Sequence, residues 1–351
     1  MVIAGLGTAA PVESYAQKEC WEALQQASQF KNLNPRSRAI LKKVLTSPNG
    51  IMTRHLALKD LADAFQLSPD VLQARFLEFG PALASQAAER ALTDANTTSR
   101  DIDAVIISTC TGYLCPGLTS YVGERLRLRP NVLALDLVGQ GCGAALPNLR
   151  MAEALLSSGQ ARRVLSICVE VCSAAFFLDN DPGVLVSACL FGDGAGAAVL
   201  TEKASHKRRV EWKTSGSLLN PQNRDLLRFE QKGGMLRNIL RPEVPVLAAE
   251  NVAQVLDIVL SQAAVPRDKI KGWVFHPGGR DVLNALSQRL QLSPFDLRWS
   301  TQILEEFGNL SSASVFFVLQ AGLSDSGASG YWWMSSFGAG FSGHGALLEV
   351  E

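Results

Sequence analysis

The chain has 351 residues, of which 47% are hydrophobic and 19% charged, and its 33 lysines and arginines balance its 33 aspartates and glutamates. This composition excludes a disordered chain, and the lack of a basic excess argues against nucleic-acid binding. At this length, folding buries roughly three quarters of the extended chain's surface, which is enough for one large core or two fused cores.

No apolar run reaches the roughly 18 residues of a membrane-spanning helix, and no basic segment precedes the first apolar residues. We therefore expect no membrane association and a cytoplasmic location. The seven cysteines are odd in number and lie mostly in apolar runs, which indicates reduced thiols rather than disulfides. The sequence contains no Cys-x-x-Cys or His-x-x-x-His pair, so we expect no metal site.

Short β-branched runs alternate with longer helical patterns along the chain, which is typical of an α/β fold. The predicted strands are 2–5, 103–109, 133–137, 163–169, 195–200, 209–212, 272–276, 331–335 and 346–350. The predicted helices are 81–96, 144–158, 250–263, 280–290 and 312–324. A polar segment at 202–209 separates the two sets of strands, so we expect an N-terminal half at 1–203 and a C-terminal half at 204–351.

The two halves resemble each other at an offset of 167 residues. Segment 99–107 matches segment 266–274, and the same offset carries Cys142 onto Asn309. Each of these two residues follows a glycine and precedes a predicted helix rich in small residues. Agreement at several segments under one offset predicts an internal duplication, with two packed α/β layers related by pseudo-symmetry.

Three residues are candidates for chemistry. Cys142 lies in Gly-Gln-Gly-Cys-Gly before a predicted helix, whose N-terminus favours a thiolate nucleophile; a buried structural cysteine in a tight turn is the alternative. His276 ends a predicted strand before Pro-Gly-Gly, where α/β proteins often place catalytic groups, although a core histidine fits equally well. For Asn309 alone, a helix N-cap is the more common role.

Five motifs together resemble the type III polyketide synthases, the chalcone-synthase-like family with the thiolase fold. They are Gly-Gln-Gly-Cys-Gly (139–143), Leu-Phe-Gly-Asp-Gly-Ala (190–195), Trp-Val-Phe-His-Pro-Gly-Gly (273–279), Gly-Asn-Leu-Ser-Ser-Ala (308–313) and Ser-Phe-Gly-Ala-Gly (336–340). The resemblance covers essentially the whole chain. It implies an α/β, thiolase-like fold with five layers, α-β-α-β-α, built from two pseudo-symmetric halves, and it implies a homodimer.

The resemblance also implies a mechanism. Cys142 would be loaded with an acyl group from a starter CoA thioester, and a positively charged His276 would favour its thiolate. His276 and Asn309 would then hold the enolate oxygen that forms when malonyl-CoA loses CO2. The enolate carbon would attack the Cys142 thioester, and repeated extension would end in ring closure to a pyrone, resorcinol or phloroglucinol-type product.

Because decarboxylation generates the carbanion, the mechanism needs no catalytic carboxylate. Acyl-CoA and malonyl-CoA are then substrates, and no cofactor is implied. The stretch 338–343 fits the dinucleotide pattern G-x-G-x-x-G, but it precedes a predicted strand rather than a helix, so we do not expect NAD binding.

Further residues are implied to shape the cavity. Phe191 matches the family's gate between the CoA tunnel and the cavity, and the other predicted substrate-binding residues are Cys110, Thr111, Cys115, Asn238, Phe337 and Gly338. Cys115 stands where plant members often carry a methionine that reaches into the partner subunit. No phenylalanine stands near 236–239, the place of the family's second gate residue, and this favours an aliphatic starter.

The basic residues Lys42, Lys43 and Arg54 are candidates for binding the phosphates of CoA, and a solvated helix face explains them equally well. Two alternatives to the main hypothesis stay open. A ketoacyl-synthase III-like enzyme would use the same three residues for one condensation with a malonyl–carrier-protein thioester. An inactive thiolase-fold partner subunit would lack a member of the triad, whereas all three are present here.

Overall fold

The computed structural model describes residues 1–202, 210–325 and 329–351. Its main sheet runs in the order β11-β12-β13-β8-β1-β7-β6-β4-β5. The strands are β1 (Val2–Ala9), β4 (Ala104–Ser108), β5 (Leu133–Leu137), β6 (Arg163–Glu170), β7 (Gly194–Thr201), β8 (Val210–Leu219), β11 (Ile270–Phe275), β12 (Gly330–Gly338) and β13 (Ser342–Val350).

This sheet consists of two similar sheets that meet at one point. Among the described residues, β1 and β8 pair at a single position, Val2 with Glu211. In the first sheet β4 and β6 are parallel, whereas β6, β7 and β1 alternate in direction. In the second sheet β11 and β12 are parallel, and β12, β13 and β8 alternate in the same way. The shared order and directions confirm the predicted pseudo-symmetry of the fold.

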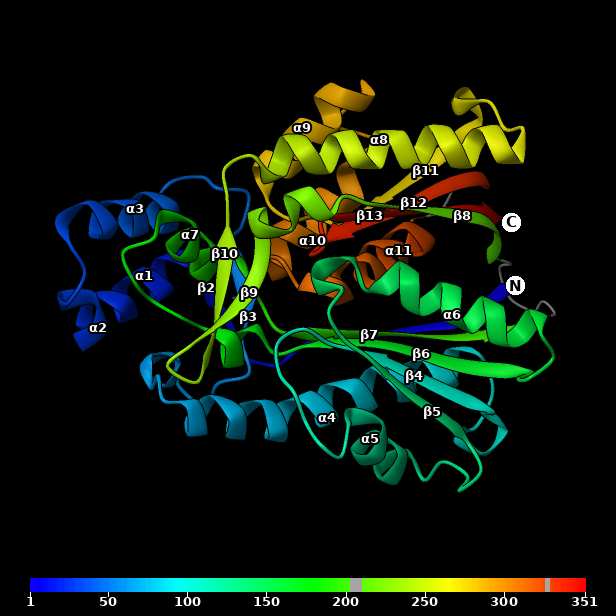
Figure 1. Ribbon diagram of the computed structural model, residues 1–351, viewed down its shortest axis with the longest axis horizontal. Coiled ribbons are helices and arrows are strands. Elements are labelled where there is room, and N and C mark those ends of the chain that lie inside the picture. Colours follow the sequence, from blue (N-terminus) through cyan, green and yellow to red (C-terminus); the bar gives the residue numbers. More distant parts are fainter. Residues whose placement is uncertain (203–209, 326–328) are drawn as a thin grey trace.

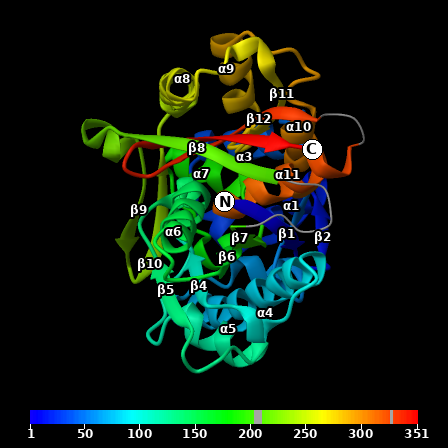
Figure 2. The same cartoon turned by 90° about the vertical axis from the view of Figure 1, so that its right-hand side faces the viewer.

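Helices fill three layers around these two sheets (Figures 1 and 2). Helices α4 (Pro69–Asp94) and α5 (Leu118–Leu126) pack on the outer face of the first sheet. Helices α8 (Val244–Ala263) and α9 (Arg280–Leu290) pack on the outer face of the second sheet. Helices α6 (Ala145–Ser157), α10 (Arg298–Phe307) and α11 (Ser314–Ser324) contribute to the core between the two sheets. The arrangement is therefore α-β-α-β-α, as the family resemblance implies.

Small residues let the layers approach closely. A Cβ atom on Gly7 of β1 would lie 2.2 Å from the carbonyl oxygen of Ala87, and one on Gly5 would lie 2.3 Å from that of Ala91. Both alanines belong to the fully buried face of α4. The glycines of β1 thus allow direct contact between strand and helix backbones, which a larger side chain would prevent.

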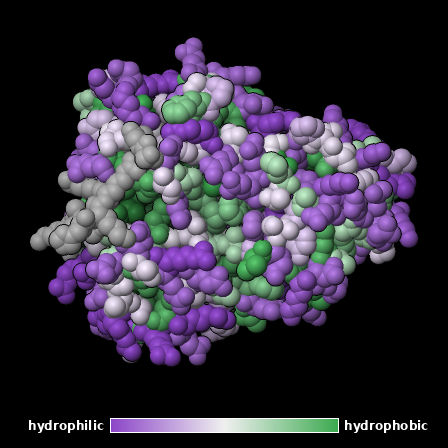
Figure 3. Space-filling model, turned by 180° about the vertical axis from the view of Figure 1, so that it is seen from behind, coloured by the Kyte–Doolittle hydropathy of each residue, from purple (hydrophilic) through white to green (hydrophobic). Residues whose placement is uncertain are grey.

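The remaining elements form one end of the molecule, at the left of Figure 1. They are α1 (Gln17–Gln26), α2 (Ser28–Lys31), α3 (Pro35–Thr46), α7 (Pro182–Leu190), the strand pair β2 (Ser14–Ala16) and β3 (Thr53–His55), and the hairpin β9 (Leu227–Lys232) with β10 (Met235–Leu240). The sequence analysis does not predict these elements. Seen from behind, hydrophilic residues cover most of the outer surface, and hydrophobic residues gather toward the middle of that face (Figure 3).

Two predicted helix starts are wrong. Helix α4 begins at Pro69 rather than at residue 81, because Ser68 caps its first turn and Pro81 lies within the helix. Helix α8 begins at Val244 rather than at residue 250, with Pro245 in its first turn, where a proline costs no hydrogen bond. The predicted boundary between residues 203 and 204 lies outside the described residues.

Helix α8 is, in the described part of the chain, the one helix long and apolar enough to cross a membrane by length and composition. Just over half of that window, 56%, is buried inside the structure. Its apolar side chains pack against the second sheet and α9. These contacts identify α8 as a core helix.

Candidate active site

The turn that carries Cys142 is built from glycines. Gly139 and Gly141 have positive φ angles of 89° and 54°, which favour glycine. A Cβ atom on Gly338 would lie 2.4 Å from the backbone nitrogen of Gly143, so the closing strand β12 touches this turn directly. Cys142 occupies a short 3-10 turn, Gly141–Gly143, immediately before α6. The sulfur atom is thereby held at the end of a buried helix between the two sheets.

The Cys142 thiol is neutral in this setting. Burial raises the pKa of Cys142 to about 12, although the hydrogen bond from Ser311 lowers it. That bond runs from Ser311 Oγ to Cys142 Sγ at 3.3 Å. The sequence analysis expects the helix N-terminus to favour a thiolate, but Cys142 precedes the Ala144 cap of α6, and the loss of solvation outweighs this favourable effect.

His276 follows the last residue of β11 and continues its pairing, because its backbone N–H donates to Ser335 O at 2.9 Å. Its ring lies edge-on against Phe337, with 5.2 Å between ring centroids. Burial lowers the pKa of His276 to about 3. Among the described residues neither ring nitrogen has a hydrogen-bond partner. The expected imidazolium is therefore replaced by a neutral imidazole whose two nitrogens are available to a substrate.

Asn309 is fixed by the backbone around it. Its Nδ2 donates to Gly278 O at 3.1 Å, and its Oδ1 accepts from the backbone N–H of Ser311 at 2.8 Å. Its own backbone N–H donates to Leu190 O, and its carbonyl oxygen accepts from Gly192. An amide group has two N–H donors, so one of them remains for a ligand.

Cys142, His276 and Asn309 line one pocket of about 420 Å³, which we call the triad pocket. Each side chain comes from the end of a different structural segment: the turn before α6, the end of β11 and the turn before α11. The structure thus brings together the three residues that the sequence analysis selects from both halves of the chain.

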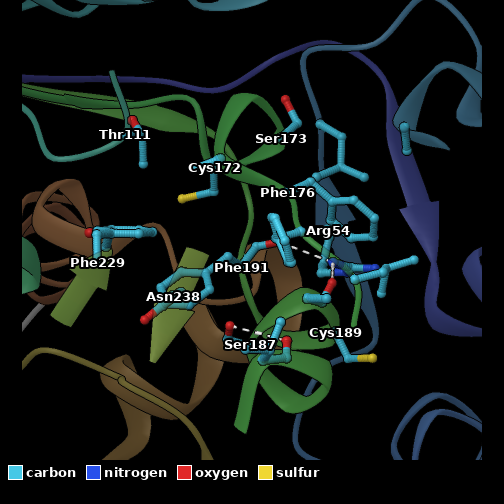
Figure 4. Close-up of a pocket in the computed structure, with 18 of the residues that line it drawn as sticks. Arg54, Thr111, Cys172, Ser173, Phe176, Ser187, Cys189, Phe191, Phe229 and Asn238 are labelled. Carbon is cyan, nitrogen blue, oxygen red and sulfur yellow. Dashed lines mark hydrogen bonds between the residues drawn. The ribbon is translucent and has the colours of Figure 1, made fainter. Parts of the chain in front are cut away.

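A second, apolar pocket adjoins the triad pocket at Phe191 (Figure 4). Cys142 and Phe191 line both this apolar pocket and the triad pocket. Phe191 also forms a backbone bridge with Asn309, so its position is tied to that of the amide. An aromatic side chain at this shared wall is where the sequence analysis expects a gate.

The other predicted cavity residues fall into two groups. Cys110, Thr111 and Asn238 line the apolar pocket, and Phe337 lines the triad pocket. Cys115 is exposed and lines neither of these pockets within its own chain, so a contact through a partner subunit stays a prediction. Gly338 also lines neither pocket. It packs instead against the backbone of Gln140 and Gly143 in the turn that carries Cys142.

A buried carboxylate beside the nucleophile is missing from the sequence prediction. Glu170, at the end of β6, is completely buried and accepts hydrogen bonds from Thr111 Oγ1 at 2.9 Å and from the backbone N–H of Cys110 at 3.0 Å. Ser312 also donates to it, and Ser311 Oγ lies 3.4 Å from its Oε1. Burial raises the pKa of Glu170, although these donors oppose the shift. The feature of the sequence that could have identified Glu170 is its position as a single acidic residue at the end of an otherwise apolar predicted strand.

The three basic residues predicted to bind the phosphates of CoA do not line the triad pocket. Arg54 is buried, and its guanidinium donates to Gln17 Oε1, Ala188 O and Phe191 O. These contacts give it a structural role, and we withdraw it as a phosphate ligand. Lys42 and Lys43 are exposed on α3, outside the lining of the triad pocket.

Two arginines that the sequence analysis does not select, Arg241 and Arg280, line the triad pocket and are exposed to solvent. Arg280 is ion-paired with Asp281, which lines the same pocket, and Arg241 is ion-paired with Asp181. Among the described residues, no group of three or more histidines, cysteines or acidic residues could hold a metal ion.

Comparisons with known proteins identify the family of the chain. Residues 22–218 match the family model described as FAE1/type III polyketide synthase-like protein, and residues 220–341 match the C-terminal domain of chalcone and stilbene synthases. The 1,3,6,8-tetrahydroxynaphthalene synthase of Streptomyces peucetius subsp. caesius is 33% identical over 329 residues, covering 91% of this chain and 84% of that protein. A 3,5-dihydroxyphenylacetyl-CoA synthase of Amycolatopsis balhimycina is 28% identical, with 90% and 83% covered.

Solved structures show the same fold. PKS-I from the brown alga Ectocarpus siliculosus superposes with a TM-score of 0.89 at 26% identity, covering 99% of this chain and 97% of that one. The 1,3,6,8-tetrahydroxynaphthalene synthase of Streptomyces coelicolor A3(2) has a TM-score of 0.90 at 22% identity, with 99% of both chains covered. From the family models, the 33% identical relative and the shared fold, we conclude that the chain belongs to the type III polyketide synthases, which are acyltransferases of the thiolase fold.

Proposed function

We propose that this polyketide synthase carries its growing chain on Cys142 and that His276 and Asn309 activate malonyl-CoA. In the loading step Cys142 Sγ attacks the carbonyl carbon of an acyl-CoA while the neutral His276 ring accepts the thiol proton. The carbon–sulfur bond to CoA breaks, and the CoA thiolate leaves with that proton. A neutral imidazole suits this step, because it can accept a proton at one nitrogen and donate at the other.

Malonyl-CoA then occupies the triad pocket. Loss of CO2 places negative charge on the thioester oxygen, where an N–H of His276 and the free N–H of Asn309 donate hydrogen bonds. The carbanion attacks the Cys142 thioester, which releases the Cys142 thiolate and leaves the lengthened chain on CoA. The thiolate then attacks this new CoA thioester, CoA leaves, and the chain is again attached to Cys142 for the next round. Because decarboxylation itself supplies the carbanion, the reaction requires only CoA thioesters, and ring closure then gives a pyrone, resorcinol or phloroglucinol-type product.

The observation that carries this proposal is that Cys142, His276 and Asn309 line one pocket while Cys142 also lines a second. Incubation with an acyl-CoA should add one acyl group to the protein, detected by intact-protein mass spectrometry. Cys142→Ala should abolish this addition and all product formation. Cys115→Ser removes an exposed thiol and is the matched control, which should still be acylated. Stoichiometric acylation of Cys142→Ala would refute the assignment.

We propose further that the enzyme is a cytoplasmic homodimer, joined at the free edge of β5. That edge strand exposes apolar side chains, with Leu133 41% exposed, and the neighbouring Val138 and Tyr113 are 60% and 71% exposed. An apolar, unpaired edge is a liability unless another strand covers it. The seven free cysteines accord with a reducing compartment.

The dimer proposal predicts that Leu133→Glu shifts the protein from dimer to monomer in sedimentation velocity. Ile258→Glu on α8 is the matched control, because Ile258 is equally exposed at 41% but lies on the opposite side of the fold. A monomeric wild-type protein, or a dimer that tolerates Leu133→Glu, would contradict the proposed interface.

A further inference from the structure

The hairpin of β9 and β10 stands apart from the main sheet, because among the described residues its two strands pair only with each other (Figure 1). Successive side chains of a strand point to opposite faces, so Leu236, Asn238 and Leu240 share one face of β10. Leu240 lines the triad pocket and Asn238 the apolar pocket, whereas Leu236 lines a further pocket beside the start of α4. This face of β10 is therefore a wall of both pockets that contain Cys142.

A second wall of the apolar pocket is formed by residues 176–191, which we call the α7 segment. Its lining residues include Phe176, Leu178, Val184, Ser187, Cys189 and Phe191. In Figure 4, Phe229 and Asn238 of the hairpin lie on one side of Phe191, and Phe176 and Cys189 lie on the other. A chain that grows from Cys142 into this pocket is enclosed between the hairpin and the α7 segment, so the separation of these two walls limits its length.

Arg237 links the two walls. Its side chain leaves the face of β10 opposite the lining residues, and it lines none of the three pockets. Its Nε lies 2.8 Å from Asp179 Oδ2, its Nη2 lies 3.4 Å from Asp181 Oδ2, and its Nη1 lies 2.8 Å from Glu230 Oε1. Two of these carboxylates belong to the α7 segment and the third to β9, so one planar guanidinium connects both walls.

The two aspartates also build the start of α7. Asp179 Oδ1 accepts from the backbone N–H of Asp181 at 2.9 Å, and Asp181 Oδ1 accepts from that of Gly183 at 2.9 Å as the N-cap of the helix. Partial burial would raise the pKa of Asp179, but hydrogen bonds from Arg237 and from the Asp181 backbone outweigh it and lower that pKa. Arg237 is thus bound to charged groups that fix the helix leading to Phe191.

Arg237 is the least exposed cation of this cluster. Its side chain is 11% exposed, whereas that of Lys232, which also reaches Asp179 at 3.3 Å, is 57% exposed. Exposed pairs contribute little to holding a structure together, and a forked arginine contributes more. Each carboxylate that binds Arg237 has one other cationic partner: Lys232 for Asp179, Arg241 for Asp181 and Arg228 for Glu230. Loss of Arg237 would therefore loosen the hairpin without leaving a carboxylate unpaired.

We propose that Arg237 is a positioning residue, which fixes the hairpin against the start of α7 and thereby sets the number of malonyl extensions. The inference rests on the proposed function, because it takes Cys142 as the atom from which the chain grows. A displacement of one wall by about 1 Å is enough to change which reaction a bound chain undergoes next.

The first test compares the products of wild-type protein and Arg237→Met. Acetyl-, hexanoyl- and p-coumaroyl-CoA are each incubated with labelled malonyl-CoA, and the products of the fastest starter are sorted by mass into numbers of extensions. In Arg237→Met the share of the main wild-type product should fall about threefold or more, while CO2 release from malonyl-CoA alone stays within about twofold. Reduced stability would not mimic this result, because unfolded molecules form no product and leave the ratio of products unchanged.

Two variants serve as controls for this result. Lys232→Met removes a cation from the same hairpin and the same aspartate, and it should leave the distribution of products as in wild type. Arg237→Lys keeps the charge but cannot bind three carboxylates in the fork geometry of arginine, so its distribution should lie between those of wild type and Arg237→Met. An unchanged distribution in a folded Arg237→Met protein, or an equal change in Lys232→Met, would overturn the inference.

The second test measures the position of the hairpin directly, by hydrogen–deuterium exchange. In Arg237→Met the amides of β9 and β10 should exchange about tenfold faster, while those of α6 keep their wild-type rates. Equal exchange of the hairpin in both proteins would refute the positioning role. If Arg237→Met fails to fold, Asp179→Asn tests the same contact, since it keeps the Oδ1 acceptor and removes the charge that faces Arg237; it should change products and exchange in the same direction.

Failure of the proposed function would be distinguishable from failure of this inference. In the first case wild-type protein would show no acylation of Cys142 with any of the three starters. In the second case wild-type Cys142 would be acylated, and Arg237→Met and Asp179→Asn would form the wild-type distribution of products.

Discussion

The two halves of the molecule place different chemistry at equivalent positions. The first half carries Cys142 in a turn before α6, and the second carries Asn309 in a turn before α11. The Cys142 sulfur accepts a hydrogen bond from the Ser311 side chain, whereas both ends of the Asn309 amide are bonded to backbone atoms. The Cys142 sulfur is thus free to form and break thioester bonds, whereas the Asn309 amide is held in one orientation as a hydrogen-bond donor.

This difference follows from local hydrogen bonding rather than from the fold. A nucleophile must form and break a thioester bond during every round of extension. An oxyanion donor is effective only when its orientation is fixed before the reaction. The duplicated fold provides the same turn before a helix in each half. In the first half, Gly139 and Gly141 shape the turn that carries the nucleophile. In the second half, hydrogen bonds to the backbone of Gly278 and Ser311 fix the amide donor.

Removing a donor from the second half should give the largest selective effect. Asn309→Ala or His276→Ala should slow malonyl-CoA decarboxylation by about 10²–10³-fold, because each removes one hydrogen bond to the enolate oxygen. Acylation of Cys142 in Asn309→Ala should stay within a few-fold of wild type. Both steps can be measured separately, by CO2 release and by intact-protein mass.

Asn309→Asp serves as the control for a merely structural role. It keeps the acceptor that binds the Ser311 backbone and loses the N–H donors. Decarboxylation should therefore fall as far as in Asn309→Ala while the thermal transition stays near that of wild type. Wild-type CO2 release in Asn309→Asp would disprove the donor role.

The sequence predicts the two turns well because each depends on nearby residues. Glycine spacing around Cys142, the Pro-Gly-Gly after His276 and the common offset to Asn309 are all visible in the chain. The strands of the main sheet are predicted at their positions for the same reason, because each forms a short apolar run between helical patterns.

What lies around the turns is less predictable, because it depends on segments distant in sequence. Arg54 resembles a surface cation in the sequence, but carbonyl oxygens of residues 188 and 191 surround its guanidinium. Glu170 is retained in the core only because hydroxyl and backbone donors from the segments at 110–111 and 311–312 converge on it. No local sequence pattern predicts that donors from such distant segments meet at one carboxylate.

The pH dependence of Cys142 alkylation tests whether the nucleophile of the first half is a neutral thiol at rest. Since burial raises the pKa of Cys142 to about 12, its reactive thiolate fraction should grow tenfold for each pH unit across the neutral range. The rate of iodoacetamide modification, measured on the Cys142 peptide in a Cys115→Ser background, should rise roughly hundredfold from about pH 6.5 to about pH 8.5. A plateau in this range would instead indicate a thiolate–imidazolium pair and contradict the neutral resting site.

The smallest expected effect concerns which half binds the phosphates of CoA. Arg241 and Arg280 of the second half line the triad pocket, whereas Lys42 and Lys43 of the first half do not. Because both arginines are exposed, each contact should contribute modestly. Arg241→Ala and Arg280→Ala should each raise the KM for malonyl-CoA about two- to fivefold at low salt, with kcat unchanged.

Added salt should reduce this difference, since it screens exposed charges over about 10 Å at 0.1 M ionic strength. Arg289→Ala is the matched control, because Arg289 is exposed on the same helix as Arg280 but lies outside the pocket lining. If Lys42→Ala and Lys43→Ala raise KM while the two pocket arginines do not, the first half supplies both the nucleophile and the CoA contacts. The division of labour between the halves would then apply to enolate stabilisation alone.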